Sequence, residues 1–376
     1  MHIPQEIIDQ IITELDDKRT LCSCSLVCSQ WLPTAQSQLF QDISISTRNV
    51  SRFLELASVN DSFFRRTSGL HLYIRENDIP GCILYPQDLS LLRACHITKL
   101  ALNSSGGPAD PTTLKHLATF IASTLPEVIE LDIVYLSAVP ANMMENIARA
   151  LPNLQKLTYT TINIPQVTET FSRFPTWPKL RVINILKCLS TSTFHRWLLA
   201  IVPFPAIEII LVAGLRHRPG VPSLTYQLLE RSASTLVDLS IFCHIIHPQD
   251  PSVVTLPPIP SLRALHCIEL TIFNFGETSL IPLSHLIASI TSPHIESVVL
   301  RFSSISVPYL CMADWAEIDD ILAGGRFSSL KRFQVIIPRH GELPFPHEGS
   351  SFFAERMPRC QLRNILEVTR IRHHSS

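Results

Sequence analysis

The sequence predicts an α/β fold in which a short helical module precedes a long array of strand–helix repeats with parallel strands. Three observations predict it: helical spacing of apolar residues in the first forty positions, a short apolar pattern that returns along the rest of the chain, and prolines that precede many copies of that pattern. The 376 residues are 46% hydrophobic, which allows a large core. The predicted domains are residues 1–45 and 46–376.

The N-terminal forty residues contain three amphipathic runs. The first lies between Pro4 and Leu15, the second ends near Cys28, and the third extends from about Ser29 to Phe40. Pro4 fits a first helical turn, where its missing N–H costs nothing. The second run is predicted to gather its apolar residues on one face: Leu21, Cys24, Val27 and Cys28. Three short helices make a marginal core, so their surplus apolar surface needs cover from the rest of the chain or from another protein.

These residues resemble an F-box over residues 3 to about 45. The resemblance rests on the run from Ile3 to Ile7, on Leu21, and most specifically on the Leu-Val-Cys-x-x-Trp signature from Leu26 to Trp31. Ile3 and the pair Ser29-Gln30 depart mildly from the family pattern. The resemblance implies docking on the Skp-type adaptor of a cullin–RING ubiquitin ligase, against the alternative of an internal helical cap. The residues implied to form or support that interface are Pro4, Ile8, Ile11, Ile12, Leu15, Leu26, Val27 and Trp31.

The rest of the chain repeats a pattern of apolar, two residues, apolar, one residue, apolar. Successive first positions are separated by 31, 26, 26, 27, 29, 26, 33 and 35 residues, near or above the ~20–29-residue period of leucine-rich repeats. The alternation at the end of each copy is typical of a strand with one buried face. The copies are Ile97-Leu100-Leu102, Val128-Leu131-Ile133, Leu154-Leu157-Tyr159, Leu180-Ile183-Ile185, Ile207-Ile210-Val212, Leu236-Leu239-Ile241, Leu262-Leu265-Cys267, Ile295-Val298-Leu300 and Leu330-Phe333-Val335.

Helical segments are predicted between the strands, and prolines mark the return from helix to strand. The pattern resembles the degenerate leucine-rich repeats that follow an F-box in many proteins of mushroom-forming fungi. The resemblance implies a solenoid with a horseshoe form, although the regular Asn after the strand motif is missing. A first strand is predicted at 69–74 and a last one within 362–371. The predicted helices are 112–124, 142–150, 192–201, 280–290 and 314–322.

Motifs of enzyme chemistry are missing from the sequence. It has no phosphate-binding glycine loop, dinucleotide fingerprint, Gly-x-Ser-x-Gly elbow or His-Glu-x-x-His helix. Thus no catalytic residue and no cofactor are expected. Two groups contain residue types that bind metals, but their spacing and context favour ordinary structural residues, so no metal is expected. They are Cys22, Cys24 and Cys28, and the set His244, His247, His266 and Cys267.

Charge and hydropathy argue against nucleic acid and membranes as partners and against a secreted protein. The 31 basic and 32 acidic residues produce no global field for nucleic acid or an anionic membrane. No apolar run reaches the ~18 residues of a membrane span. The N-terminus lacks the basic and apolar segments of a signal peptide, and ten scattered cysteines fit reduced thiols. An intracellular protein is expected, in the cytoplasm, the nucleus or both.

The resulting hypothesis is a non-catalytic substrate-recognition subunit of an SCF-type ubiquitin ligase. The F-box would hold the adaptor and, through it, a cullin, while the repeats bind a substrate protein. Rivals are a non-ligase interaction scaffold and an enzyme or small-molecule sensor built in the repeats. Candidate substrate contacts are polar residues between the buried strand positions: Glu130, Asp132, Lys156, Asn184, Asp238 and Lys331.

Overall fold

The structure, a computed structural model, divides into two compact units centred on Met1–Leu180 (unit 1) and Phe204–Ser376 (unit 2, which also holds 181–191 and 195–200). None of the helices in the part that it describes is long and apolar enough to cross a membrane. The described residues are 3–15, 17–46, 48–59, 66–75, 92, 95–105, 111–134, 141–160, 177–186, 198–213, 224–245, 262–274, 283–303, 313–338 and 349–371.

Unit 1 begins with the three predicted helices, α1 (Gln5–Thr13), α2 (Lys18–Val27) and α3 (Leu32–Leu39). Each helix begins at or next to a residue that favours a helix N-terminus. Pro4 precedes α1, and Pro33 lies in the first turn of α3. The Asp17 side chain caps α2 by accepting from the Thr20 backbone N–H at 2.8 Å and from its hydroxyl at 2.6 Å. These hydrogen bonds lower the pKa of the Asp17 carboxyl.

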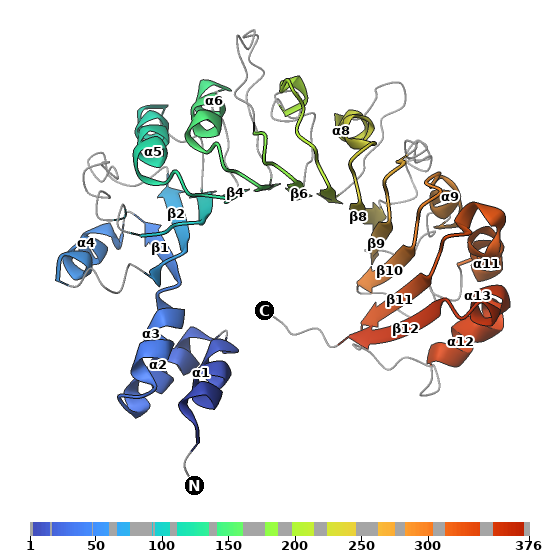
Figure 1. The fold of residues 1–376 in the computed structure, drawn as a ribbon, viewed down its shortest axis with the longest axis horizontal. Helices are drawn as coiled ribbons and strands as arrows, with labels where there is room; N and C mark the ends of the chain where they lie inside the picture. The colour runs from blue at the N-terminus through green and yellow to red at the C-terminus, as the bar shows by residue number, and fades with distance from the viewer. Residues whose placement is uncertain are drawn as a thin grey trace. The chain divides into compact units, whose positions relative to one another are not determined.

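Five strands of unit 1 follow one another in chain order and pair in parallel where their register is described (Figure 1). Three helices lie between them: α4 (Val50–Val59), α5 (Pro111–Thr124) and α6 (Ala141–Ala150). The strands are β1 (Asp42–Ser46), β2 (Gly69–Arg75), β3 (Lys99–Ser105), β4 (Glu130–Val134) and β5 (Lys156–Thr160).

Unit 2 continues the arrangement with seven described strands, again parallel and in chain order. The strands are β6 (Val182–Leu186), β7 (Ile209–Ala213), β8 (Asp238–Ile245), β9 (Cys267–Asn274), β10 (Ser297–Ser303), β11 (Arg332–Pro338) and β12 (Leu366–Ile371). The helices are α8 (Leu224–Ser232), α9 (Leu283–Ala288), α11 (Trp315–Ala323), the 3-10 turn η4 (Gly325–Phe327), α12 (Gly349–Arg356) and α13 (Pro358–Leu362).

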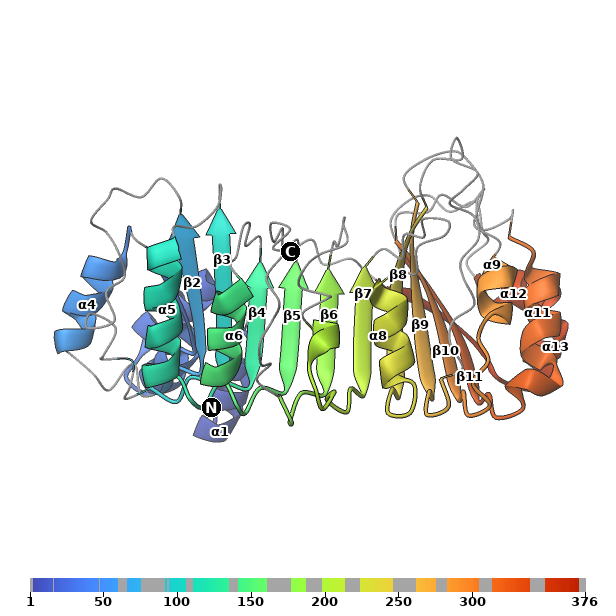
Figure 2. The ribbon, with the colours of Figure 1, turned by 90° about the horizontal axis from the view of Figure 1, so that it is seen from above.

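Within each unit one face of the strands is buried under helices. Figure 2 shows α5 and α6 in front of the strands of unit 1, and α8 in front of the strands of unit 2. Alternation sets the two faces: in β4, Leu131 and Ile133 are fully buried, whereas Glu130, Asp132 and Val134 are half-buried. We call the side opposite the helices the open face.

A backbone motif also repeats from strand to strand. The carbonyl of the residue before a strand accepts hydrogen bonds from two successive N–H groups at the start of the next strand. Arg181 O, for example, accepts from Glu208 N and Ile209 N at 2.8 and 3.1 Å. The motif recurs at Gln41, Ser68, Thr98, Ile129, Glu208, Val237, His266 and Glu296. Main-chain groups therefore bridge neighbouring strands without the regular Asn that the sequence lacks.

Two parts of the strand prediction are corrected. β1 was not predicted, and it occupies 42–46, at the end of the predicted helical module. In β9, Cys267 pairs with Asp238 on the open face, while Ile268 pairs with Leu239 on the buried face. The ninth-strand pattern is therefore Leu265-Ile268-Leu270, three residues later than predicted. Of the predicted helices, 192–197 and 280–282 lie outside the described residues.

Candidate functional site

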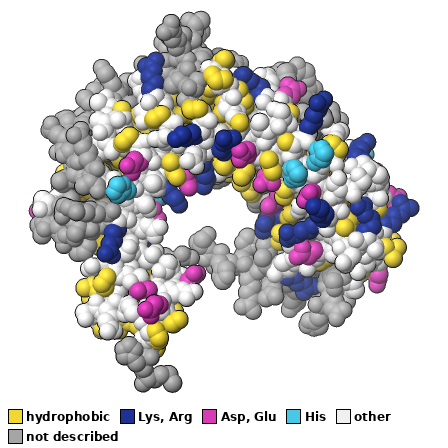
Figure 3. All heavy atoms as spheres, in the orientation of Figure 1, with side chains coloured by type: hydrophobic (Ala, Val, Ile, Leu, Met, Phe, Trp, Pro, Cys, Tyr) yellow, Lys and Arg dark blue, Asp and Glu magenta, His cyan; other side chains and the backbone are white. Residues whose placement is uncertain are grey.

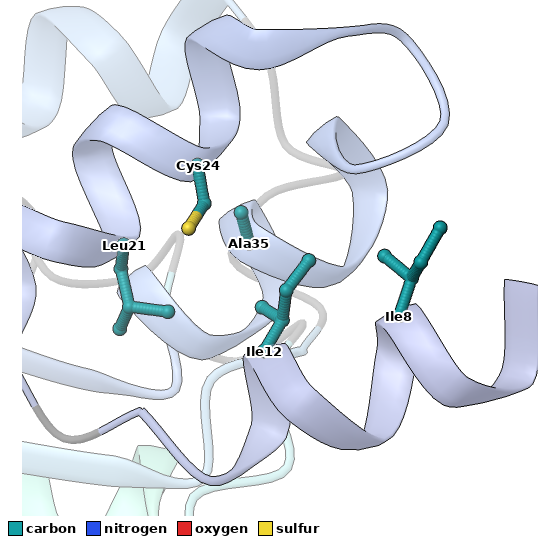
Figure 4. Packing of buried hydrophobic residues seen from close by; sticks show 5 residues of the cluster. All are labelled: Ile8, Ile12, Leu21, Cys24 and Ala35. Atoms are coloured by element: carbon teal, nitrogen blue, oxygen red, sulfur yellow. The ribbon is translucent and has the colours of Figure 1, made fainter. Parts of the chain in front are cut away.

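The N-terminal module, α1 to α3, has its own small core. Ile8 and Ile12 of α1 meet side chains of α2 and α3, and Leu15, Trp31 and Leu39 pack against the cluster from its margin. Figure 4 shows the five buried residues pointing toward one another: Ile8, Ile12, Leu21, Cys24 and Ala35. The internal packing of the module therefore uses one apolar stripe of α1.

Polar contacts fix the position of α1 against α3. The Asp9 carboxylate accepts from the Thr34 hydroxyl at 2.5 Å and from Gln5 Nε2 at 2.8 Å. Gln5 Nε2 also donates to the Gln30 carbonyl at 3.1 Å. The two hydrogen bonds to the Asp9 carboxylate are charge-assisted and are therefore stronger than neutral ones. The module is thus held in one arrangement by an apolar core and by a polar bridge.

Outside this core, the module exposes large apolar side chains (Figure 3). Ile3, Ile7 and Ile11 follow at four-residue spacing along α1 and the segment before it, and Leu26 and Val27 end α2. Leu26 is 86% exposed and Ile11 is 56% exposed. Large exposed apolar groups of this kind mark interaction sites more often than ordinary surface.

The eight residues implied as adaptor-binding therefore divide into two sets. Four are exposed: Pro4, Ile11, Leu26 and Val27. Four belong to the internal core or its margin: Ile8, Ile12, Leu15 and Trp31. Sequence reasoning did not include Ile3 and Ile7 among the adaptor contacts, although both are exposed. The four-residue spacing with Ile11 was the available signal. Of the four residues predicted to share one face of the second run, Leu21 and Cys24 are buried, whereas Val27 and Cys28 are exposed.

On the open face of unit 1, the structure brings Glu130 and Lys156 together. They occupy paired positions of β4 and β5, and their side chains form an ion pair at 3.3 Å. Asp132 lies two residues along β4, and its Oδ1 is buried with no hydrogen-bond partner among the described residues. These three predicted substrate contacts thus share one region of unit 1.

The other three predicted contacts lie in unit 2. Asn184 is on the open face of β6, and Asp238 is on that of β8. Lys331 precedes β11, is exposed, and forms an ion pair with Glu296 at 2.9 Å. The hydrogen bond that Lys331 donates within this ion pair is the main reason why the pKa of Glu296 is lowered. Burial raises the pKa of the Asp238 carboxyl, and the nearby His266 partly opposes the shift.

Further ion pairs cover the open face from β9 to β12. Arg301 Nε lies 2.6 Å from Glu269 Oε1, and Arg332 Nε lies 2.8 Å from Glu367 Oε2. Gln334 donates to the Thr369 hydroxyl at 3.0 Å. These four open-face charges are therefore matched by their neighbours. Within the described part of the chain, His, Cys, Asp and Glu side chains form no group of three or more that could hold a metal ion.

Comparison with known proteins identifies the N-terminal part only. A family model described as F-box-like matches residues 1–46, which include α1, α2, α3 and β1. No curated protein matches the chain. The comparison therefore supports an F-box protein through its N-terminal module, whose helices carry the exposed apolar residues.

Proposed function

We propose that this chain is the substrate-recognition subunit of an SCF-type, cullin–RING ubiquitin ligase. In this proposal the module of residues 1–45 docks on a Skp-type adaptor, and residues 46–376 form a leucine-rich-repeat-like solenoid that binds a substrate protein. Domains of the F-box family typically bind Skp-type adaptors. The observation that carries the proposal is the exposed apolar surface of a module whose own core is complete.

The energetics favour a protein partner for that surface. Full burial of an Ile or Leu side chain contributes about 1.5–3 kcal/mol. Ile7, Ile11, Leu26 and Val27 are all substantially exposed in the chain alone. A protein that covered them would gain a hydrophobic centre of the kind found in stable interfaces. Ile8, Ile12, Leu15 and Trp31 would act indirectly, by holding α1 and α2 in place.

The reaction itself would take place on other subunits. The chain would hold a substrate so that its lysines reach the ubiquitin-conjugating enzyme that the cullin recruits, and it would act by raising effective concentration. F-box proteins are generally non-catalytic adaptors. Open-face residues are the proposed substrate contacts: Glu130, Asp132, Lys156, Asn184, Asp238 and Lys331. Such an assembly would act in the cytoplasm or the nucleus.

Co-purification of the full chain with a Skp-type adaptor and its cullin tests the proposal. Leu26→Asp should abolish retention of the adaptor because it places a charge in the apolar interface. Leu362→Asp is the matched control, since Leu362 is also a helical leucine that is 86% exposed, but lies at the end of α13. A second pair is Ile11→Asp and Leu56→Asp, whose side chains are each 56% exposed.

The outcomes separate the hypotheses. Retention of adaptor and cullin by the wild type and both controls, with loss in Leu26→Asp and Ile11→Asp, supports the ligase subunit. Retention of the adaptor without a cullin would instead favour a scaffold outside a ligase. If wild type and variants all fail to bind, or all bind equally, the proposed docking surface is wrong.

A further inference from the structure

The open face of unit 2 contains apolar side chains where a polar surface is expected. The apolar strip consists of Val182 and Leu186 in β6, Ile209, Leu211 and Ala213 in β7, and Phe242 in β8. Register and alternation place these residues on the face opposite the core. Apart from Ala213, which is buried, their side chains remain half-buried or exposed, and Ile209 is 37% exposed.

The strip differs from the strands on either side of it in the chain. The corresponding open-face positions of β1, β2, β4 and β5 in unit 1 hold Ser44, His71, Asp132 and Thr158, and that of β3 holds the small, buried Ala101. From β9 to β12 the open face has the ion pairs of Glu269 with Arg301 and of Arg332 with Glu367. The core of unit 2 does not need the strip, because Ile183, Ile210 and Leu239 fill the opposite face of the same strands. Ile209 and Leu211 of the strip therefore form apolar surface that lies outside this core.

The carboxylate of Asp238 adjoins the strip. Asp238 pairs with Ile209 in the β7–β8 register, so the two side chains are direct neighbours on the open face. Among the described residues, Asp238 forms no hydrogen bond and no ion pair. His266 interacts with it only by a longer-range electrostatic effect, which lowers the pKa of Asp238. The nearby acids differ in this respect, since Glu208 is 2.8 Å from Arg181 and Glu269 is 2.6 Å from Arg301. Within the described part of unit 2, Asp238 is thus a half-buried acid without a matching cation, unlike Glu208 and Glu269.

The geometry points to a binding site for a protein segment that carries a Lys or Arg within about two residues of a large apolar side chain. The apolar side chain would cover Ile209 and Leu211, and the cation would lie against Asp238. Neighbouring strands are about 4.8 Å apart, so both contacts fit within one short stretch of ligand. Charge complementarity selects a basic segment over an acidic one.

This inference rests on the proposed function, in which the open face binds the substrate, and it names the chemistry of the segment. An apolar centre beside one specific charge is the arrangement that concentrates binding energy in protein interfaces. A half-buried carboxylate also has a larger effect on a bound cation than a fully solvated one, because local screening is weaker.

A phage-displayed library of random nonapeptides, selected on the full chain, tests the site. The wild type should enrich peptides in which Leu, Ile, Phe or Met lies within two residues of Lys or Arg. Leu211→Asp should reduce recovery of these peptides at least about tenfold, equivalent to ~1.4 kcal/mol. Asp238→Lys should exchange the basic preference for an acidic one, while Asp238→Asn removes the charge preference and retains the apolar one.

Val134→Asp is the matched control, because Val134 is a half-buried apolar residue on the open face of β4, in unit 1. It should leave the selection unchanged, and melting curves check that each variant is folded. The inference falls if the wild type enriches no such peptides, if Val134→Asp lowers recovery equally, or if Asp238→Lys keeps the basic preference. It also falls if the chain is a dimer that Leu211→Asp dissociates, since a second copy would then cover the strip.

The same protein variants, tested both for adaptor retention and for peptide selection, distinguish failure of this binding site from failure of the proposed function. Leu26→Asp should lose the adaptor and still select the same peptides. Peptide selection without adaptor retention in the wild type would remove the ligase assignment but leave the site on unit 2. Adaptor retention without peptide selection would do the reverse.

Discussion

Two groups of short helices, α1 to α3 in unit 1 and α11 to α13 in unit 2, contrast in how they use their apolar residues. The N-terminal group has a core of small and medium side chains and exposes Ile3, Ile7, Ile11, Leu26 and Val27. The C-terminal group buries Trp315, Phe353, Met357 and Cys360, and the Trp315 and Phe353 rings meet edge to face with centroids 4.9 Å apart. Leu362 is its large exposed apolar residue among those described.

Polar contacts reinforce the contrast. In the C-terminal group, buried Asp319 of α11 accepts from the backbone N–H groups of Arg359 and Cys360 at 2.9 and 2.8 Å, at the start of α13. Arg363 donates to the Leu322, Phe327 and Leu330 carbonyls. Helices that cover the end of a core are expected to bury their apolar side chains and to satisfy their backbone polar groups internally. Helices that bind a partner keep apolar surface available, so local composition alone does not separate a cap from a docking module.

Trp315→Ala should give the largest loss of stability. Removing a fully buried aromatic side chain from packed surroundings costs about 3–5 kcal/mol. Urea unfolding, followed by far-UV circular dichroism, measures the change. A loss below about 1 kcal/mol would mean that the C-terminal helices do not form the closed group described.

Ile12→Ala should cost somewhat less, about 2–5 kcal/mol, and its effect should concentrate in the N-terminal module. Ile12 is 1% exposed, whereas its neighbour Ile11 is 56% exposed. Ile11→Ala is therefore the control and should change stability by less than about 0.5 kcal/mol. Limited proteolysis, with cleavage sites located by mass spectrometry, distinguishes local opening of the module from global unfolding. Equal effects of the two substitutions would contradict the division of α1 into a buried and an exposed stripe.

Asp319→Ala should cost about 1–3 kcal/mol because it leaves two backbone N–H groups at the start of α13 without their acceptor. Asp320→Ala is the adjacent control, since its ion pair with Arg359 is well exposed. Hydrogen exchange at Arg359 and Cys360 reports the effect locally. Unchanged protection there would show that Asp319 does not fix α13.

A smaller effect should appear at alkaline pH. Burial raises the pKa of the Cys95 thiol to about 11, and burial together with Asp319 raises that of Cys360. Unfolded thiols ionise first, near pH 9, so the folded state binds more protons and stability should fall as pH increases from about 9 to 11. Urea titrations across this range measure the fall. Cys95→Ser and Cys360→Ser variants should show a smaller slope.

Alkylation by iodoacetamide provides the matching comparison of cysteines. Cys22 and Cys28 are exposed in the N-terminal module, whereas Cys360 is buried. The two exposed thiols should react first at pH 8, and Cys360 should react only when the chain unfolds. Early modification of Cys360 would show that the C-terminal group opens readily.

The sequence was sufficient to predict the three N-terminal helices and most of the parallel strands, because their apolar spacing is regular. It did not predict β1, whose five residues end the module without the repeated pattern. The register of β9 was misjudged because Leu262 and Leu265 are both apolar and both buried, so either could begin the pattern. Packing, and not local sequence, decides between them.

The candidate surfaces were predictable only in part, because local sequence does not show which apolar residues face the core. α1 has isoleucines on two sides, and periodicity does not say whether the stripe of Ile8 and Ile12 or that of Ile7 and Ile11 faces inward. On the strands, open-face contacts were sought among polar residues. That choice included Asp238 but passed over Ile209 and Leu211, which in sequence are indistinguishable from core positions. Strand pairing was needed to place them on the open face.

The order of the strands has a consequence for how the chain folds. Each described strand pairs with strands next to it in the sequence, so the contacts that build both units are made between neighbouring segments. Little chain entropy is lost before each new pairing is made. Folding can therefore begin at one pair of strands and extend to the next. During synthesis, the N-terminal helices and the first strands can reach their native arrangement before the last strands leave the ribosome.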